Sequence, residues 1–256
     1  MGKLLTNMGK NLIFFIPCFL LLASLLHCIH AVQYIVTNKV PNTPGGKLFD
    51  REIGVNFTLL TLETVNKFIW KILEQRTAAD IKNVPVVNLY ISDFQGYAYK
   101  NGDNINVSGP ALDMFYYPRN KSKFFFSSLM YHEMTHVFQW HGNFTAPGGL
   151  TEGIADYVMV KSNIYEKEKY TKFGSGSRWD EGYGVTERFL EYCDSLRKGF
   201  TAELNKKMRY KYSDHYFVEL LGKPVDQLWR EYKAKYGKKQ VSTADSFGTM
   251  FPGVKY

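Results

Sequence analysis

Apolar and polar residues follow different periodicities along the 256-residue chain, and these predict strands early and helices later. Alternating or β-branched runs at 34–40 and 84–93 predict strands, and 97–109 predicts two short strands around an Asn-Gly-Asp-Asn turn. Apolar residues recur at helical spacing in 57–75, so we expect a long helix there. The Pro- and Gly-rich stretch 41–46 predicts a loop.

After residue 120 the pattern is mainly helical. An apolar run that includes Tyr-His-Glu-Met-Thr-His-Val-Phe-Gln-Trp (131–140) predicts a helix that Asn120 or Ser122 caps and Gly142 ends. Periodicity also predicts helices at 150–162, 185–199, 213–222 and 224–237. This order predicts an α+β protein, in which a small mixed sheet packs on the central helix and a mainly helical C-terminal part follows.

The first 31 residues have the pattern of a secretory signal peptide. Lys3 and Lys10 precede the apolar run 12–26, and the segment ends in the small residue Ala31. The alternative is a membrane anchor, but the run is short for a bilayer span, so we expect no stable anchor. Residues 32–256 would then form a single secreted domain, with an N-terminal α/β half to about 145 and a helical half after it.

Removal of a signal peptide would leave Cys193 as the single cysteine, so no internal disulfide is expected. Its helical spacing from Phe189 and Leu196 favours a buried, inert thiol. In a secreted chain, Asn-x-Ser/Thr triplets are acceptors for glycans. Four are present, at Asn56, Asn106, Asn120 and Asn143.

Composition narrows the classes of function. Hydrophobic residues make up 45% of the chain, which is enough for a packed core and argues against disorder. The net charge is +8, but Lys and Arg are spread among Asp and Glu, without a basic block that aromatic residues interrupt. We therefore expect a solvated basic surface and no nucleic-acid partner. A monomer is also expected.

The segment 131–140 carries candidate metal chemistry. His132 and His136 are four residues apart and lie on one face of a helix, where both can bind one ion. Catalytic zinc sites use three protein ligands and a water, and Glu133 can reach that water as a general base. The alternative is a pair of hydrogen-bonded histidines on a partly buried face.

A third ligand has to come from elsewhere. Some secreted metalloproteases carry it six residues after the second histidine, but that position is Gly142 here, and His141 is out of phase with the other two. Glu152 and Asp156 share a face at the start of the next predicted helix. We expect Glu152 to be the ligand and Asp156 to hold the ring N–H of a zinc histidine. Asp156 as the ligand remains the alternative.

Several segments resemble the plant basic secretory proteases, a pathogenesis-related group. They are VTNKVPNTPGG (36–46), YHEMTHVFQW (131–140), GLTEGIADYV (149–158), GYGVTERFLEYC (182–193) and DQLWREYKAKYG (226–237). The resemblance implies a zincin-like fold, Zn²⁺, secretion to the plant cell exterior and a role in defence. It also implies that His132 and His136 are ligands and that Glu133 is catalytic.

The sequence thus predicts a secreted zinc-dependent endopeptidase that acts on protein or peptide substrates. The alternative is a non-enzymatic secreted defence protein that binds a glycan, a peptide or a microbial surface and retains the zinc site. Tyr183, and after it His215, are candidates to stabilise the oxyanion. The strand predicted within 102–109 could be a sheet edge that pairs with an extended peptide.

Overall fold

The computed structural model describes residues 32–115 and 121–237, in which four strands form one mixed sheet. The strands are β1 (Gln33–Asn38), β2 (Val86–Ser92), β3 (Ala98–Asn101) and β4 (Asn104–Ser108), in the order β1-β2-β4-β3. β1, β2 and β4 run parallel, and β3 is antiparallel to β4. The small mixed sheet is therefore confirmed. The expected edge strand is wrong, because β4 lies inside the sheet and β3 forms the edge.

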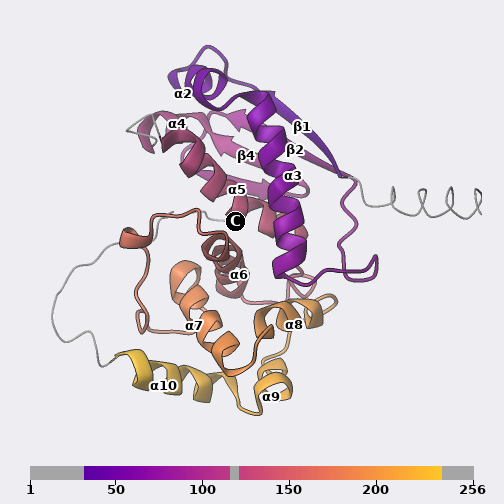
Figure 1. Cartoon of the computed structure of the whole chain (residues 1–256), viewed down its shortest axis with the longest axis vertical. Coiled ribbons are helices and arrows are strands. Elements are labelled where there is room, and N and C mark those ends of the chain that lie inside the picture. The colour runs from indigo at the N-terminus through magenta and orange to yellow at the C-terminus, as the bar shows by residue number, and fades with distance from the viewer. Residues whose placement is uncertain (1–31, 116–120, 238–256) are drawn as a thin grey trace, which may run out of the picture.

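One face of the sheet packs against the hydrophobic core. The buried side chains of β2 alternate with partly exposed ones, as a strand covered on one side requires. Leu89 pairs with Ile105, and Ala98 pairs with Val107, so these apolar side chains share a face. The helices α3 (Gly54–Ile72) and α5 (Ser122–Phe138) pack together and contact strands at opposite edges, β1 and β3. Figure 1 shows both helices beside the sheet.

The remaining chain is mainly helical, as predicted. α2 (Pro44–Leu48) and a π-helical turn (Phe49–Ile53) precede α3, and α4 (Gly109–Phe115) follows the sheet. After α5 come α6 (Gly148–Lys161), a 3-10 turn (Lys167–Lys169), α7 (Tyr183–Leu196), α8 (Phe200–Lys207), α9 (His215–Leu221) and α10 (Val225–Tyr236). In Figure 1 the sheet, α3 and α5 fill the upper part of the molecule, and α6 to α10 fill the lower part. The α+β class is confirmed.

α5 is the central helix of the molecule. From Ser128 to Phe138 every residue is buried, because α3, β3 and α6 pack around it. Polar side chains on this segment therefore lie in the interior, where they need partners. The helix ends earlier than expected, at Phe138, and Gln139 is already extended. Of the two predicted caps, Ser122 lies inside the helix, and Asn120 lies outside the described residues.

The predicted loop at 41–46 is partly wrong. α2 begins at Pro44, where a proline suits the first helical turn, and the Thr43 hydroxyl accepts a hydrogen bond from Gly46 N at 3.1 Å. α4 and α8 are also helices that the periodicity did not reveal. All three are short, with five to eight residues, so few turns repeat the pattern.

Several sequence predictions concern the surface and the chain ends. The segment interpreted as a signal peptide, 1–31, lies outside the described residues. Of the glycan acceptors described, Asn56 and Asn143 are exposed and Asn106 is half-buried, and glycosylation stays a prediction.

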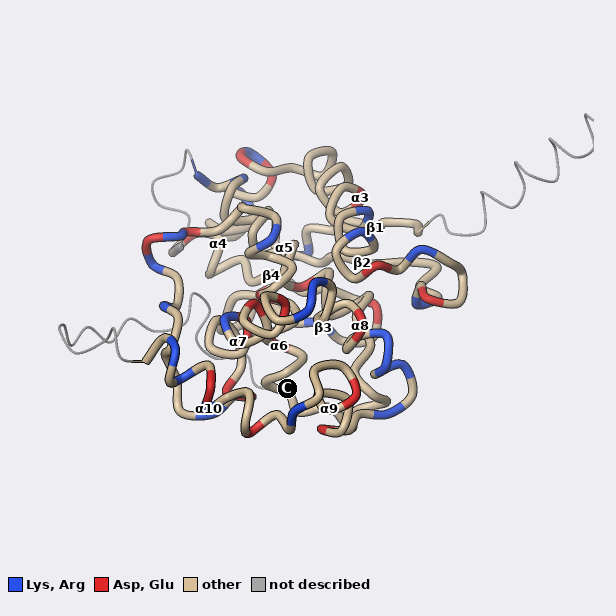
Figure 2. The backbone as a smooth tube through the Cα atoms, turned by 60° about the horizontal axis from the view of Figure 1, so that its bottom comes forward, with Lys and Arg blue, Asp and Glu red and all other residues tan. Residues whose placement is uncertain are grey.

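Cys193 is fully buried in α7, and this burial raises the pKa of its thiol well above the usual value. Across 32–115 and 121–237, no helix combines the length and apolarity that crossing a membrane requires. Figure 2 shows positive and negative residues interspersed.

Candidate metal centre

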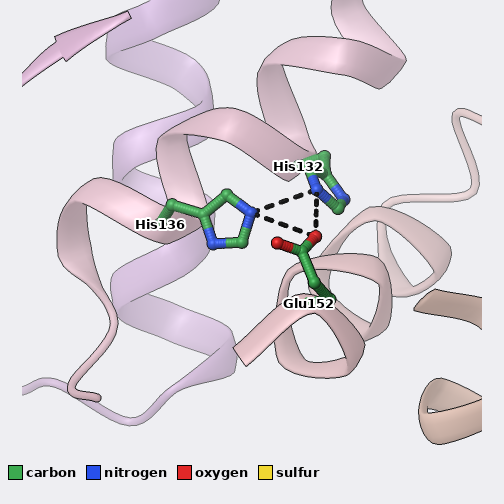
Figure 3. Close-up of side chains that lie close together, drawn as sticks. All are labelled: His132, His136 and Glu152. Atoms are coloured by element: carbon green, nitrogen blue, oxygen red, sulfur yellow. Dashed lines mark hydrogen bonds and ion pairs between the residues drawn. The ribbon is translucent and has the colours of Figure 1, made fainter. Parts of the chain in front are cut away.

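Three buried side chains from α5 and α6 converge on one point. His132 and His136 are one helical turn apart on α5, and Glu152 lies in the second turn of α6, which packs against α5. Glu152 Oε2 lies 3.1 Å from His132 Nε2 and 3.5 Å from His136 Nε2, and the two Nε2 atoms are 3.1 Å apart. One ligand atom from each residue fits within 4.8 Å of the others. Figure 3 shows the three side chains pointing toward one another.

Asp156 occupies the other side of the His132 ring. His132 Nδ1 donates to Asp156 Oδ1 at 2.8 Å, and the Tyr170 hydroxyl donates to Asp156 Oδ2 at 2.8 Å. Both carboxylate oxygens therefore already have partners. Of the two carboxylates considered, Glu152 faces both Nε2 atoms, while Asp156 holds the ring from behind. Tyr170 was not anticipated, because it lies in a segment without helical or strand periodicity.

Gln139 is a second contact that the sequence did not reveal. Its side-chain amide lies 2.7 Å from His136 Nδ1 and donates to the backbone oxygen of Thr151 at 3.2 Å. The residue is 2% exposed, and within 32–115 and 121–237 its Oε1 has no hydrogen-bond partner. The amide thus joins the end of α5 to the first turn of α6. Because α5 ends at Phe138, the side chain of Gln139 turns back onto the histidine.

Glu133 lies beside the two histidines. It is 3% exposed, and its Oε2 has no hydrogen-bond partner among the described residues. Burial is the main cause that raises the pKa of Glu133; the histidines and Lys100 oppose it, and the charge of Glu152 adds to it. A buried carboxylate with a raised pKa and an unpaired oxygen is suited to take and return a proton.

The donor set fits a divalent metal ion. Burial opposes a charged His132, but hydrogen bonds with Asp156 and Glu152 outweigh it and raise the pKa of His132 well above its usual value. Burial would raise the pKa of Glu152, yet the two histidines hold it well below its usual range. Glu152 Oε1 is buried and accepts no hydrogen bond from the part of the chain that the structure describes. Two imidazoles and a carboxylate are a ligand set that zinc uses in catalytic sites.

The oxyanion candidates are placed differently. Tyr183 begins α7 and stacks on His132, with ring centroids 5.9 Å apart and planes 12° from parallel. Its φ of 45° lies in the left-handed region, which is uncommon for a residue other than glycine. His215 is exposed on α9, where its nearest charged partner is Glu219 at 3.9 Å. Figure 1 places α9 at the lower end of the molecule, far from α5.

His141 lies outside the metal-binding group. It follows α5 in a loop, is half-buried, and accepts a hydrogen bond at Nδ1 from Phe144 N at 3.0 Å. Burial lowers the pKa of His141, and the charges of Lys82 and Lys100 lower it further. The helix phase of His141 argued against a ligand role, and the group that could hold a metal does not include it.

Fold and site together define a class of protein. A His-Glu-x-x-His helix packs beside a mixed sheet, and the next helix supplies a glutamate, which is consistent with a zincin-like metallopeptidase. Residues 29–232 match the family described as "Peptidase of plants and bacteria", and the chain belongs to this family, BSP.

A curated relative points to the same group. A "Basic secretory protease" from Boswellia serrata is 46% identical over 75 residues, which cover 29% of this chain and 92% of the relative. The chain matches no solved structure.

Proposed function

We propose that this member of the peptidase family is a secreted, zinc-dependent endopeptidase. One observation carries the proposal: His132, His136 and Glu152 converge in a buried group beside Glu133, whose free oxygen and raised pKa suit a general base. His132, His136 and Glu152 would hold the ion. When bound, zinc would polarise the scissile carbonyl and lower the pKa of a water.

The chain's own residues would handle the protons. Glu133 takes a proton from the attacking water and returns it to the leaving amine, so the same carboxyl acts first as base and then as acid. Asp156 accepts the Nδ1 proton of His132, so Nε2 is the ring nitrogen that would bind the metal. This role is why we propose Glu152, rather than Asp156, as the third ligand.

Tyr183 is the proposed partner of the oxyanion. Its ring stacks on His132, so Tyr183 lies next to the residues that would hold the metal. A hydroxyl donor aimed at the negative charge that develops on the carbonyl oxygen lowers the barrier for peptide hydrolysis. His215 is not proposed for this role, because it is exposed on a distant helix.

Secretion and a role in plant defence are also proposals. They are supported by the basic, apolar and small-residue pattern of residues 1–31 and by the name of the relative from Boswellia serrata. Expression of the full chain in plant cells, followed by N-terminal sequencing of the extracellular protein, tests the first. A mature terminus near Val32 is expected, whereas retention in the cell would contradict secretion.

The catalytic proposal is tested with Glu133→Gln. This variant should bind one zinc ion, measured by elemental analysis, and should lose peptide hydrolysis, because an amide cannot accept the proton. Glu63→Gln is the matched control, since Glu63 is an exposed residue of α3 that pairs with Lys67. Retained hydrolysis by Glu133→Gln would overturn the mechanism. Zinc binding without hydrolysis in the wild type would favour the non-enzymatic alternative.

A further inference from the structure

Lys100 stands at the edge of the sheet, on the side where α5 lies. It pairs with Ile105, and residues that pair directly across two strands point to the same face. Ile105 is completely buried on the face that the helices cover, and Ala98, two residues before Lys100, is buried there as well. The Lys100 side chain therefore emerges on the helix side of β3, the edge strand that contacts α5.

Lys100 has two basic neighbours that come from other parts of the chain. Lys82 lies in the segment that leads into β2, and His141 lies in the loop after α5. Burial lowers the pKa of Lys82 to about 8, and the charge of Lys100 contributes to the shift. Both lysines act on His141, and Lys100 acts on Glu133. The three basic residues thus act on one another, and Lys100 also acts on the proposed catalytic carboxylate.

In the described part of the chain, no carboxylate lies within ion-pair distance of Lys82 or Lys100. Lys82 and Lys100 are both half-buried, and in 32–115 and 121–237 neither forms an ion pair or a hydrogen bond. Asp103, in the turn between β3 and β4, acts on both through its charge but lies beyond ion-pair distance. Partial burial of two like charges is unfavourable, and a carboxylate placed between them would relieve that repulsion.

We propose that Lys82 and Lys100 form a subsite that binds a carboxylate of the peptide substrate next to the scissile bond. The inference rests on the proposed peptidase function and adds a substrate class to it. The carboxylate is either the side chain of an aspartate or glutamate, or the terminus of the substrate chain. Lys100 lies on β3, which contacts α5, the helix that carries Glu133, so we expect the bound carboxylate and the bond to be cleaved to lie within the same short peptide segment.

Cleavage of a peptide mixture by the zinc-loaded protein tests the subsite. The mixture varies three positions on each side of the cleaved bond, each peptide is made with a free and with an amidated C-terminus, and products are quantified by mass spectrometry. We expect an acidic residue at one position to raise kcat/KM about tenfold over its amide, the size of one charge-assisted hydrogen bond. A strong preference for the free terminus instead would identify the terminal carboxylate.

Variants connect the preference to the lysines. In Lys82→Gln/Lys100→Gln the preference should fall below about threefold, and Lys100→Glu should favour Lys or Arg at the same position. Lys71→Gln is the matched control, because Lys71 is an exposed lysine near the end of α3 and should leave the preference unchanged. Circular dichroism melting checks that each variant folds. Absence of any carboxylate preference, or its survival in the double variant, would overturn the subsite.

Binding separates the subsite from the peptidase function. A dye-labelled hexapeptide with one aspartate, and the same peptide with asparagine, are titrated into zinc-loaded Glu133→Gln with and without the two Lys→Gln changes. Tighter binding of the aspartate peptide that the lysine changes abolish supports the subsite even if no peptide is cleaved. Equal binding of both peptides overturns the subsite while leaving the peptidase proposal intact.

Discussion

Zinc binding should displace one proton from His132. Its Nδ1 lies 2.8 Å from Asp156 Oδ1, and its Nε2 lies 3.1 Å from Glu152 Oε2. Burial opposes the charge, but both ring nitrogens face carboxylates that raise the pKa of His132 well above its usual value, so we expect a positively charged ring before the ion binds. A metal ligand needs an unprotonated nitrogen, so Nε2 must release its proton when the ion enters. The expected stoichiometry is about one proton per zinc ion at pH 7.

Calorimetry in buffers of different ionisation enthalpy measures this release. The observed binding enthalpy plotted against the buffer enthalpy should have a slope of about one in magnitude. The titration is repeated in Glu133→Gln, because the pKa of Glu133 is also raised and a cation beside it could release a second proton. The slope of this variant isolates the contribution of His132. An enthalpy that does not depend on buffer, with full zinc binding, would refute a charged His132.

Asp156→Asn extends the same test. The amide removes one of the two carboxylates that raise the pKa of His132, so the ring carries less charge before binding and the proton release should fall well below one. Loss of the carboxylate behind a ligand histidine should also weaken zinc affinity by about 10- to 100-fold. For the wild type, free zinc at 1,000 times Kd should stabilise the fold by about 4 kcal/mol, measured as a shift in Tm.

Three other residues yield predictions. Gln139→Leu should weaken zinc binding about 10-fold, because His136 Nδ1 loses its amide partner, whereas Gln139→Glu should retain most of the affinity. Chelator competition measures both, and equal zinc affinity in the wild type and the two variants would contradict this role of Gln139. Tyr183→Phe should lower kcat about 100-fold with KM little changed, and an unchanged kcat would exclude its hydroxyl from the oxyanion site. Burial raises the pKa of Glu187 well above its usual value, so the native state keeps a proton that the unfolded chain releases, and stability falls as pH rises. The free energy of unfolding of Glu187→Gln, measured with urea, should therefore match that of the wild type near pH 4 and exceed it by about 1–3 kcal/mol near pH 8. Parallel pH profiles of the two proteins would argue against a buried, protonated Glu187.

The sequence predicted those elements whose pattern repeats over several turns or residue pairs. β2 and the β3–β4 hairpin followed from alternation and a turn, and α5 and α6 followed from long helical segments. α2 could not be predicted in this way, because Pro44, Gly45 and Gly46 favour a loop by local propensity. A tertiary contact determines the structure at this position. A Cβ on Gly45 would lie 1.8 Å from the backbone oxygen of Gly109, so only glycine lets α2 lie this close to the start of α4.

In the candidate site too, periodic spacing predicted some residues, whereas others depend on tertiary contacts. His132 and His136 follow from a spacing of four on one helix, and Glu152 was chosen because helix phase allowed two carboxylates to share a face. The contacts around these residues depend on where the chain goes after each helix. Gln139 reaches His136 because α5 ends at Phe138. The sequence predicted that the helix continues to Gly142, so this contact could not be foreseen. No periodic signal marks such a position.

The glycines of α6 explain how Tyr183 reaches the site. A Cβ on Gly149 would lie 1.9 Å from Asp180 O, and a Cβ on Gly153 would lie 2.3 Å from a methyl group of Thr186, so α6 and the start of α7 approach more closely than other residues allow. Glu152 lies between these two glycines, on the helix that supplies the proposed third ligand. The close approach that places Tyr183 against His132 is therefore built into the same two turns of helix that carry Glu152 to the histidines.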